Sequence, residues 1–191
     1  MENIKILHTA DMHLGSLLLN MEQKSDERKK ELNSTFASII DLALSEGVDA
    51  LLIAGDMFEN SKPSSELLDF VNEQFKRLGD IKVFISLGNH DWGLKAEFPS
   101  NVYVFSDYIE RVSFKNADIY GVSFADEHCS VSVSEGFEVE DADKINILLM
   151  HGEVGRKSIY NPIDEKQLQN SGIDYAALGH VHTHDGFVKL G

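Results

Sequence analysis

The chain has 191 residues, of which 42% are hydrophobic and 26% charged, a composition typical of a globular domain with a core of its own. Its 32 acidic against 17 basic residues give a net charge of −15, which repels polyanions and argues against a module that binds nucleic acid through a basic surface. No apolar run approaches the ~20 residues that span a bilayer. No secretory signal opens the sequence, and Cys129 is the only cysteine, so we expect a cytoplasmic protein without an internal disulfide.

The first half of the chain alternates between strand-like and helix-like segments. The segment 50–54 is apolar throughout, as expected of a parallel strand that is covered on both faces. A β-α-β-α-β order predicts a mostly parallel sheet, which places ligands at the carboxyl ends of its strands. The predicted strands are 4–7, 50–54 and 82–86, and the predicted helices are 26–45 and 63–78.

The second half has shorter elements. Three strand-like runs from residue 102 onward, with no helix between them, predict an antiparallel meander in a second sheet. Arg156 and Lys157 lie in a later loop, where they would reach either a substrate phosphate or only solvent. The predicted elements are strands 102–105, 109–114, 117–124, 145–150, 175–178 and 186–190, a mostly irregular segment 125–144, and a short helix near 164–171.

Five of these strands end in side chains that can bind a metal ion. Asp11 and His13 are two residues apart, so in extended chain they project from the same face. Imidazole, carboxylate and amide oxygen suit manganese first, with iron, zinc or magnesium as alternatives. Seven ligands exceed the needs of one ion and fit two ions about 4 Å apart that share a carboxylate. The candidate ligands are Asp11, His13, Asp56, Asn89, His151, His180 and His182.

Such a site predicts phosphoester hydrolysis. Two carboxylates against two divalent ions leave a charge of about +2, which attracts a phosphate. The same charge lowers the pKa of a bound water and so supplies a hydroxide that attacks phosphorus. His90, next to Asn89 and paired with Asp91, is the candidate that assists the leaving group, so His90 and Asp91 are the predicted catalytic residues.

The order of these motifs resembles the calcineurin-like metallophosphoesterase superfamily over nearly the whole chain. The resemblance implies an α/β fold, a four-layer sandwich of two mixed β-sheets flanked by helices. It also implies that Asp56 bridges two ions and that His90 is catalytic. Asp11, His13 and His182 would complete the first ion's ligands, and Asn89, His151 and His180 the second's. The motifs are Asp11-Met12-His13, Gly55-Asp56, Gly88-Asn89-His90-Asp91, His151-Gly152 and Gly179-His180-Val181-His182.

Within that superfamily the chain is most similar to the SbcD-type DNA repair exonuclease subunits, in the segments 8–15, 55–58, 62–64 and 175–180. This similarity implies a homodimer and an SbcC-like ATPase partner. Glu59 departs from the pattern, because these nucleases usually carry histidine or aspartate there. We expect residues 1–191 to form a single metallophosphoesterase domain that lacks the C-terminal closing strands and capping domain of such nucleases.

Two other functions remain open at this stage. A phosphodiesterase or phosphatase for small nucleotides would suit the acidic charge. A non-catalytic binding scaffold of the same fold would have no need for all seven ligands. We expect Arg28, Lys29 and Lys30 to form a solvated helix face, and the pair His128 and Cys129 to be structural rather than a zinc site.

Overall fold

The computed structural model describes residues 3–17, 22–155, 158–182 and 189, and no helix in these ranges is both long and apolar enough to cross a membrane. In chain order the elements are β1 (Ile6–Thr9), α1 (Glu22–Glu46), β2 (Ala50–Ala54), α2 (Ser65–Arg77), β3 (Lys82–Ser86), β4 (Val102–Val104), β5 (Glu110–Phe114), β6 (Ala117–Val122), β7 (Ile145–His151), β8 (Glu153–Val154), β9 (Pro162–Ile163), α3 (Glu165–Asn170) and β10 (Tyr175–Gly179).

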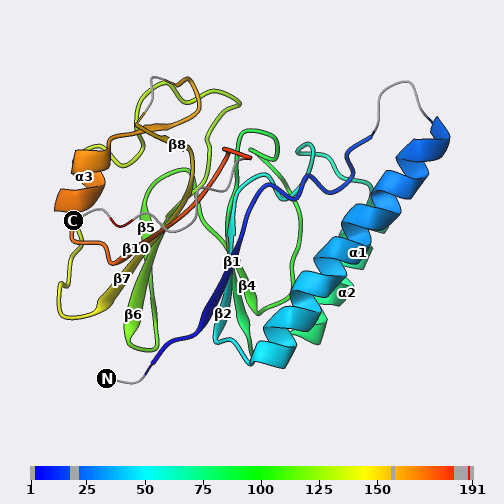
Figure 1. Ribbon diagram of the computed structural model, residues 1–191, viewed down its shortest axis with the longest axis horizontal. Helices are drawn as coiled ribbons and strands as arrows, with labels where there is room; N and C mark the ends of the chain where they lie inside the picture. The colour runs from blue at the N-terminus through cyan, green and yellow to red at the C-terminus, as the bar shows by residue number, and fades with distance from the viewer. Residues whose placement is uncertain (1–2, 18–21, 156–157, 183–188, 190–191) are drawn as a thin grey trace.

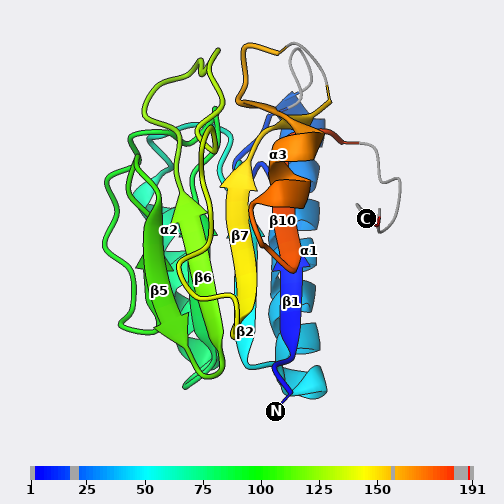
Figure 2. The ribbon, with the colours of Figure 1, turned by 90° about the vertical axis from the view of Figure 1, so that its left-hand side faces the viewer.

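Two four-stranded sheets pack face to face (Figure 1). The first has the order β1-β2-β3-β4 and is parallel throughout, and the second has the order β10-β7-β6-β5 with one antiparallel pair, β5 and β6. Helices α1 and α2 lie side by side on the outer face of the first sheet, while α3 lies on the far side of the second (Figures 1 and 2). The predicted α/β sandwich of two sheets flanked by helices is confirmed.

Alternation along the buried strands explains the layers. In β2, Leu51 and Ile53 pack toward the helices with Phe36 and Phe75. Their neighbours Leu52 and Ala54 face the second sheet instead. Because successive side chains of a strand point to opposite faces, an apolar run such as 50–54 must be covered on both. A third apolar cluster, which includes Leu148, Met150 and Leu168, lies between the second sheet and α3.

The two long helices follow the predicted apolar spacing. In α1, Phe36, Ile40 and Ala43 are fully buried or nearly so, at the spacing that places them on one helix face. Helix α2 begins after Ser64, whose hydroxyl accepts a hydrogen bond from the Leu67 backbone N–H at 3.2 Å and so caps the first turn. Both predicted helices are therefore present, and α1 begins four residues earlier than predicted.

The predicted antiparallel meander is wrong in its first strand. Strand β4 pairs in parallel with β3, with Tyr103 opposite Phe84, and so belongs to the first sheet. The remaining two strands, β5 and β6, do form an antiparallel hairpin. The prediction failed because the connection between two parallel strands usually contains a helix. Here residues 87–101 lead from the carboxyl end of β3 back to the amino end of β4 without one.

Other predictions have mixed outcomes. Residues 125–144 contain no helix and no strand longer than the single bridge of Cys129 to Tyr160, as predicted. The short pair β8 and β9 was not predicted, since two-residue strands have no periodicity to detect. Arg156, Lys157 and all of the predicted strand 186–190 except residue 189 lie outside the described residues.

The carboxyl ends of five strands meet at one end of the sandwich. Strands β1, β2 and β3 are parallel to one another, as are β7 and β10. A hydrogen bond joins the two sheets at this end, since Nδ1 of His151, at the end of β7, lies 2.8 Å from the carbonyl oxygen of Ala54, at the end of β2. All the predicted ligands follow or end these strands.

Candidate metal centre

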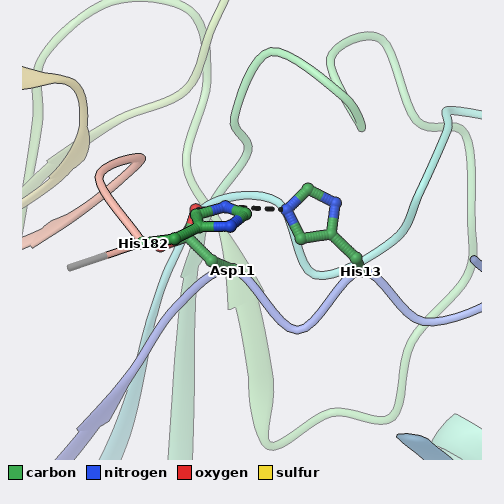
Figure 3. A group of neighbouring side chains, drawn as sticks. All are labelled: Asp11, His13 and His182. Atoms are coloured by element: carbon green, nitrogen blue, oxygen red, sulfur yellow. Dashed lines mark hydrogen bonds and ion pairs between the residues drawn. The ribbon is translucent and has the colours of Figure 1, made fainter.

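Asp11, His13 and His182 form the first of three groups whose ligand atoms lie within 4.8 Å of one another (Figure 3). The Nε2 atoms of His13 and His182 lie 3.3 Å apart, and Nε2 of His182 is 3.6 Å from a carboxylate oxygen of Asp11. Figure 3 shows the two imidazoles turned toward each other, with Asp11 beside the His182 ring. Burial lowers the pKa of His13, which favours the neutral ring that a metal needs.

Asp56 lies between this group and the next. Its Oδ2 is 4.0 Å from Nε2 of His13 and 3.1 Å from Nε2 of His151, while its Oδ1 accepts a hydrogen bond from the His90 backbone N–H at 2.8 Å. Burial acts to raise the pKa of Asp56, but the hydrogen bond and charge of His151, aided by His90, outweigh it and hold the pKa below its ordinary value. The carboxylate is therefore ionised at neutral pH.

His151 and His180 extend the site into the second sheet. They form a group with Asp56 in which the two imidazole ring centres are 5.1 Å apart, and Nε2 of His151 is 3.2 Å from the side-chain oxygen of Asn89. Burial acts to lower the pKa of His151, but Asp56 and the Ala54 carbonyl raise it above its ordinary value. Because Nδ1 faces that carbonyl, Nε2 is the atom that can bind a metal.

Four of the candidate ligands have an unusual backbone conformation. Asp11, His13, Asp56 and His180 have φ angles of 54°, 47°, 49° and 104°, in the left-handed region that non-glycine residues seldom occupy. Residues held there cost on the order of 1–3 kcal/mol each and gather at functional sites. The seven predicted ligands thus come together, and their oxygen and nitrogen donors fit two divalent ions of the hard to borderline class.

Gly88 leaves the space that the Asp56 carboxylate occupies, because a Cβ at residue 88 would lie 2.2 Å from Asp56 Oδ1. We expect Gly88→Ala to displace Asp56, to weaken metal binding by about tenfold or more and to lower the free energy of unfolding by about 2 kcal/mol. Metal titration and urea unfolding in chelator measure the two effects. In Gly136→Ala nothing lies within 4 Å of the added Cβ, but the φ of +72° strains an alanine, so this variant should lose some stability and keep its metal affinity. Equal losses of metal affinity in both variants would contradict the expectation.

The structure places the two predicted catalytic residues apart from each other. The Asp91 carboxylate is buried and accepts hydrogen bonds from the backbone N–H groups of Gly88 at 2.7 Å and Phe58 at 3.1 Å. Nδ1 of His90 lies instead 3.2 Å from the backbone carbonyl of Glu59. The predicted pairing of His90 with Asp91 is therefore wrong: an aspartate after a histidine can also fold back on its own loop, as Asp91 does. His90 itself is exposed and forms a group with His13 and Asp56.

Asp91 should act on stability in a pH-dependent way. Burial raises its pKa to about 6, against the opposing effect of the two N–H donors. The folded state then binds more protons than the unfolded state between about pH 4 and 6, so the contribution of Asp91 to stability falls as pH rises through that window. Asp91→Asn removes one acceptor and should lower the free energy of unfolding by about 2 kcal/mol or more.

The difference between wild type and Asp91→Asn isolates this effect. We expect the variant's deficit in unfolding free energy to be about 1 kcal/mol smaller at pH 7.5 than at pH 5, measured by urea unfolding in chelator. A deficit independent of pH would mean that Asp91 has an ordinary pKa in the folded protein.

Comparison with known proteins identifies the family. The sequence model of the calcineurin-like phosphoesterases matches residues 4–184. This chain belongs to the calcineurin-like phosphoesterase family. Its residues 11, 13, 56, 89, 151, 180 and 182, which converge at the strand ends, all lie within the matched range.

Several curated proteins are similar to this family member along almost its full length. It is 33% identical to an uncharacterized metallophosphoesterase, YhaO, from Bacillus subtilis, over 94% of this chain and 49% of the relative. It is 29% identical to the DNA double-strand break repair protein Mre11 of Saccharolobus solfataricus, over 94% and 50%. It is 24% identical to a subunit of the nuclease SbcCD from Staphylococcus epidermidis, over 94% and 57%. The chain thus spans about half the length of the curated relatives it matches.

Glu59, the residue that departs from the SbcD pattern, contributes to this phosphoesterase site in two ways. Its carboxylate lies 3.2 Å from Nδ1 of His13, and its backbone carbonyl faces His90. The Glu59 carboxylate and Nδ1 of His13 are close enough for an electrostatic contact but do not form a hydrogen bond. Glu59 therefore contacts His90 through its backbone and His13 through its side chain.

Two neighbours of the site were missed or underrated from sequence. Arg28, expected to be part of a solvated face, lines a hollow next to Asp11. The Tyr160 ring lies 4.9 Å from that of His180 and stacks on His128 at 5.4 Å. Cys129 donates its S–H to the Val131 carbonyl, and the metal-type groups in the described part of the chain include neither Cys129 nor His128. The one sequence signal for the position of Tyr160 near the site is that it lies in the loop that follows His151.

Proposed function

We propose that this chain is the phosphoesterase domain of a two-metal hydrolase that cleaves phosphodiester bonds in DNA, as an exonuclease or endonuclease of the SbcD type. The observation that carries the proposal is the convergence of seven ligand-type side chains from five strand ends, with Asp56 between the two halves. The names of the relatives, a break-repair protein and part of a nuclease, support DNA as the substrate.

The candidate ligands fall into two sets, one for each ion. Asp11, His13 and His182 would hold one ion, and Asn89, His151 and His180 the other, with Asp56 shared. Two divalent ions would supply the positive charge that ionises water near neutral pH and offsets the phosphate charge. Manganese is the ion we propose, since the donor set is oxygen and imidazole without thiolate.

His90 is placed to assist the leaving group. Its side chain is exposed and stands beside His13 and Asp56, with 4.7 Å between the ring centres of His90 and His13. The Glu59 carbonyl, 3.2 Å from Nδ1, favours a proton on that nitrogen and leaves Nε2 available to the substrate. To act as an acid the ring would have to be doubly protonated: Nε2 would then give its proton to the departing oxygen as the ester bond breaks, and Nδ1 would keep its own.

A small-nucleotide phosphodiesterase or phosphatase is the second candidate. The net charge of −15 favours it, because an acidic protein repels a long polyanion more than a mononucleotide. A DNA enzyme with this charge would depend on metal and on local cations at the site. The proposal also includes a homodimer and an SbcC-like ATPase partner, as the resemblance to SbcD-type subunits implies. The name of one relative, a subunit of nuclease SbcCD, supports a partner subunit.

The deciding experiment measures hydrolysis of bis-p-nitrophenyl phosphate, p-nitrophenyl phosphate and a short DNA duplex, each with manganese and with chelator. Manganese-dependent cleavage of the diester and the duplex is the result we expect. Cleavage of the diester without the duplex would favour the small-nucleotide enzyme, and cleavage of the monoester alone a phosphatase. Silence on all three, with metal bound, would favour a binding scaffold.

A further inference from the structure

A hollow of about 290 Å³ opens beside the first group of candidate ligands, between the end of β1 and the middle of α1. It shares Asp11, His13 and His182 with the metal centre. A volume of this size is at the lower end of what small-molecule sites offer and accommodates a group such as a nucleoside. The hollow is therefore continuous with the place where a substrate phosphate would lie.

The far wall of the hollow combines apolar and polar groups. Leu32 and Ile39 of α1, both half-buried, supply the apolar surface, and the buried side chains of Phe36 and Met12 lie behind it. Thr35 lies at the exposed edge, and its hydroxyl is already bonded to the Glu31 carbonyl. An apolar wall with few polar groups is typical of a site for a flat aromatic group such as a nucleobase.

Arg28 is the only lysine or arginine among the described residues that line the hollow. Its guanidinium is 3.7 Å from Glu31, an exposed contact that holds it weakly. The guanidinium is therefore free to turn toward an anion, and it is always charged. In a chain with a net charge of −15, this cation offers a local attraction for a phosphate-linked group.

The position of the hollow also says which part of the substrate it would hold. The His13 ring contacts the rings of both His90 and His182, with ring centres 4.7 Å and 5.1 Å away. The hollow is lined by His13 and His182 but, among the described residues, not by His90. A group in the hollow would thus contact His13 and His182 rather than the proposed leaving-group residue.

We propose that this hollow binds the nucleoside that stays attached to phosphorus, with Arg28 contacting its phosphate and the α1 wall packing on its base. This inference rests on the proposed function and deepens it, because it assigns α1 a role in substrate selection. The enzyme then prefers a nucleotide diester over a simple alkyl diester with the same leaving group.

Two esters with the same leaving group test this preference. Thymidine 5′-(p-nitrophenyl phosphate) and methyl p-nitrophenyl phosphate differ only in the group that would occupy the hollow. We expect the wild-type protein with manganese to prefer the thymidine ester. Arg28→Gln, and Thr35→Phe, which fills the hollow from its exposed edge, should each reduce the ratio of kcat/KM values by about tenfold. Lys30→Gln, which removes a neighbouring charge that does not line the hollow, should leave the ratio unchanged.

A binding measurement separates the failure of this inference from that of the proposed function. Calorimetric titration of thymidine 5′-monophosphate into the protein in chelator should show binding that both variants weaken by about tenfold. If the wild-type protein hydrolyses neither ester, the proposed function fails, and the titration alone decides the hollow. An unchanged ratio, or unchanged nucleotide binding, in Arg28→Gln and Thr35→Phe would overturn the inference.

Discussion

Replacement of Asp56 with asparagine should lower metal content and activity together. Its Oδ2 is 3.1 Å from His151 and 4.0 Å from His13, so one carboxylate serves both halves of the site. The amide removes a negative charge and one oxygen ligand from a position 2% exposed to solvent. A loss of several kcal/mol in charge stabilisation corresponds to a fall in kcat/KM on the order of a thousandfold.

Metal content per chain after dialysis against manganese, and hydrolysis of bis-p-nitrophenyl phosphate, measure the two losses. Asp56→Asn should retain fewer ions than wild type, whereas Asp69→Asn, an exposed carboxyl on α2, should retain all of them. Full metal content with unchanged turnover in Asp56→Asn would remove Asp56 from the site. Circular dichroism should show that both variants keep the fold.

Replacement of His90 with alanine should affect the chemistry alone. The side chain is exposed and, among the described residues, lies beside the Glu59 carbonyl, the His13 ring and Asp56, so its removal should cost little stability. General acid catalysis is worth about 10²–10⁴ in rate. We therefore expect kcat to fall by about that factor while metal content stays at the wild-type level.

The leaving group sharpens this test. A thymidine dinucleotide expels an alkoxide that needs a proton, whereas bis-p-nitrophenyl phosphate expels a stable phenolate. If His90 protonates the departing oxygen, His90→Ala should lose more rate on the dinucleotide than on the nitrophenyl ester. His128→Ala, an exposed histidine outside the metal-type groups, is the matched control. A loss of metal in His90→Ala would make His90 a ligand, and equal losses on both substrates would exclude it as the acid.

Much of this arrangement could be predicted from sequence because the signals are local. Five strands are short apolar runs that end in a ligand-type residue, so parallel pairing brings the ligands of each sheet to one edge of that sheet. The sequence shows a glycine before several of these ligands, but it does not show why a larger residue would not fit there. A Cβ at Gly179 would lie 2.1 Å from the Ala54 carbonyl, which only the packed structure reveals.

The predictions that failed concern contacts between segments distant in sequence. The pairing of β4 with β3 depends on the path of residues 87–101, which has no periodic pattern. Asp91 turns to the Phe58 backbone, 33 residues earlier, rather than to its neighbour His90. Arg28 has the same surroundings in sequence as Lys29 and Lys30, yet of these three it alone lines the hollow. No local signal distinguishes such residues.

The hydrogen bond between His151 and the Ala54 carbonyl joins two sheets whose facing surfaces are mostly apolar, with the contacts of Ser86 to Val122 and of His8 to Tyr175 as further polar links. Three of the candidate ligands, His151, His180 and His182, follow strands of the second sheet, and the other four follow strands of the first. The thickness of the apolar layer between the sheets therefore sets the spacing between the two sets of ligands. Larger or smaller side chains between the sheets would move the two sets of ligands apart or together. Such changes in the core would alter which ion the site prefers without any change in the ligands themselves.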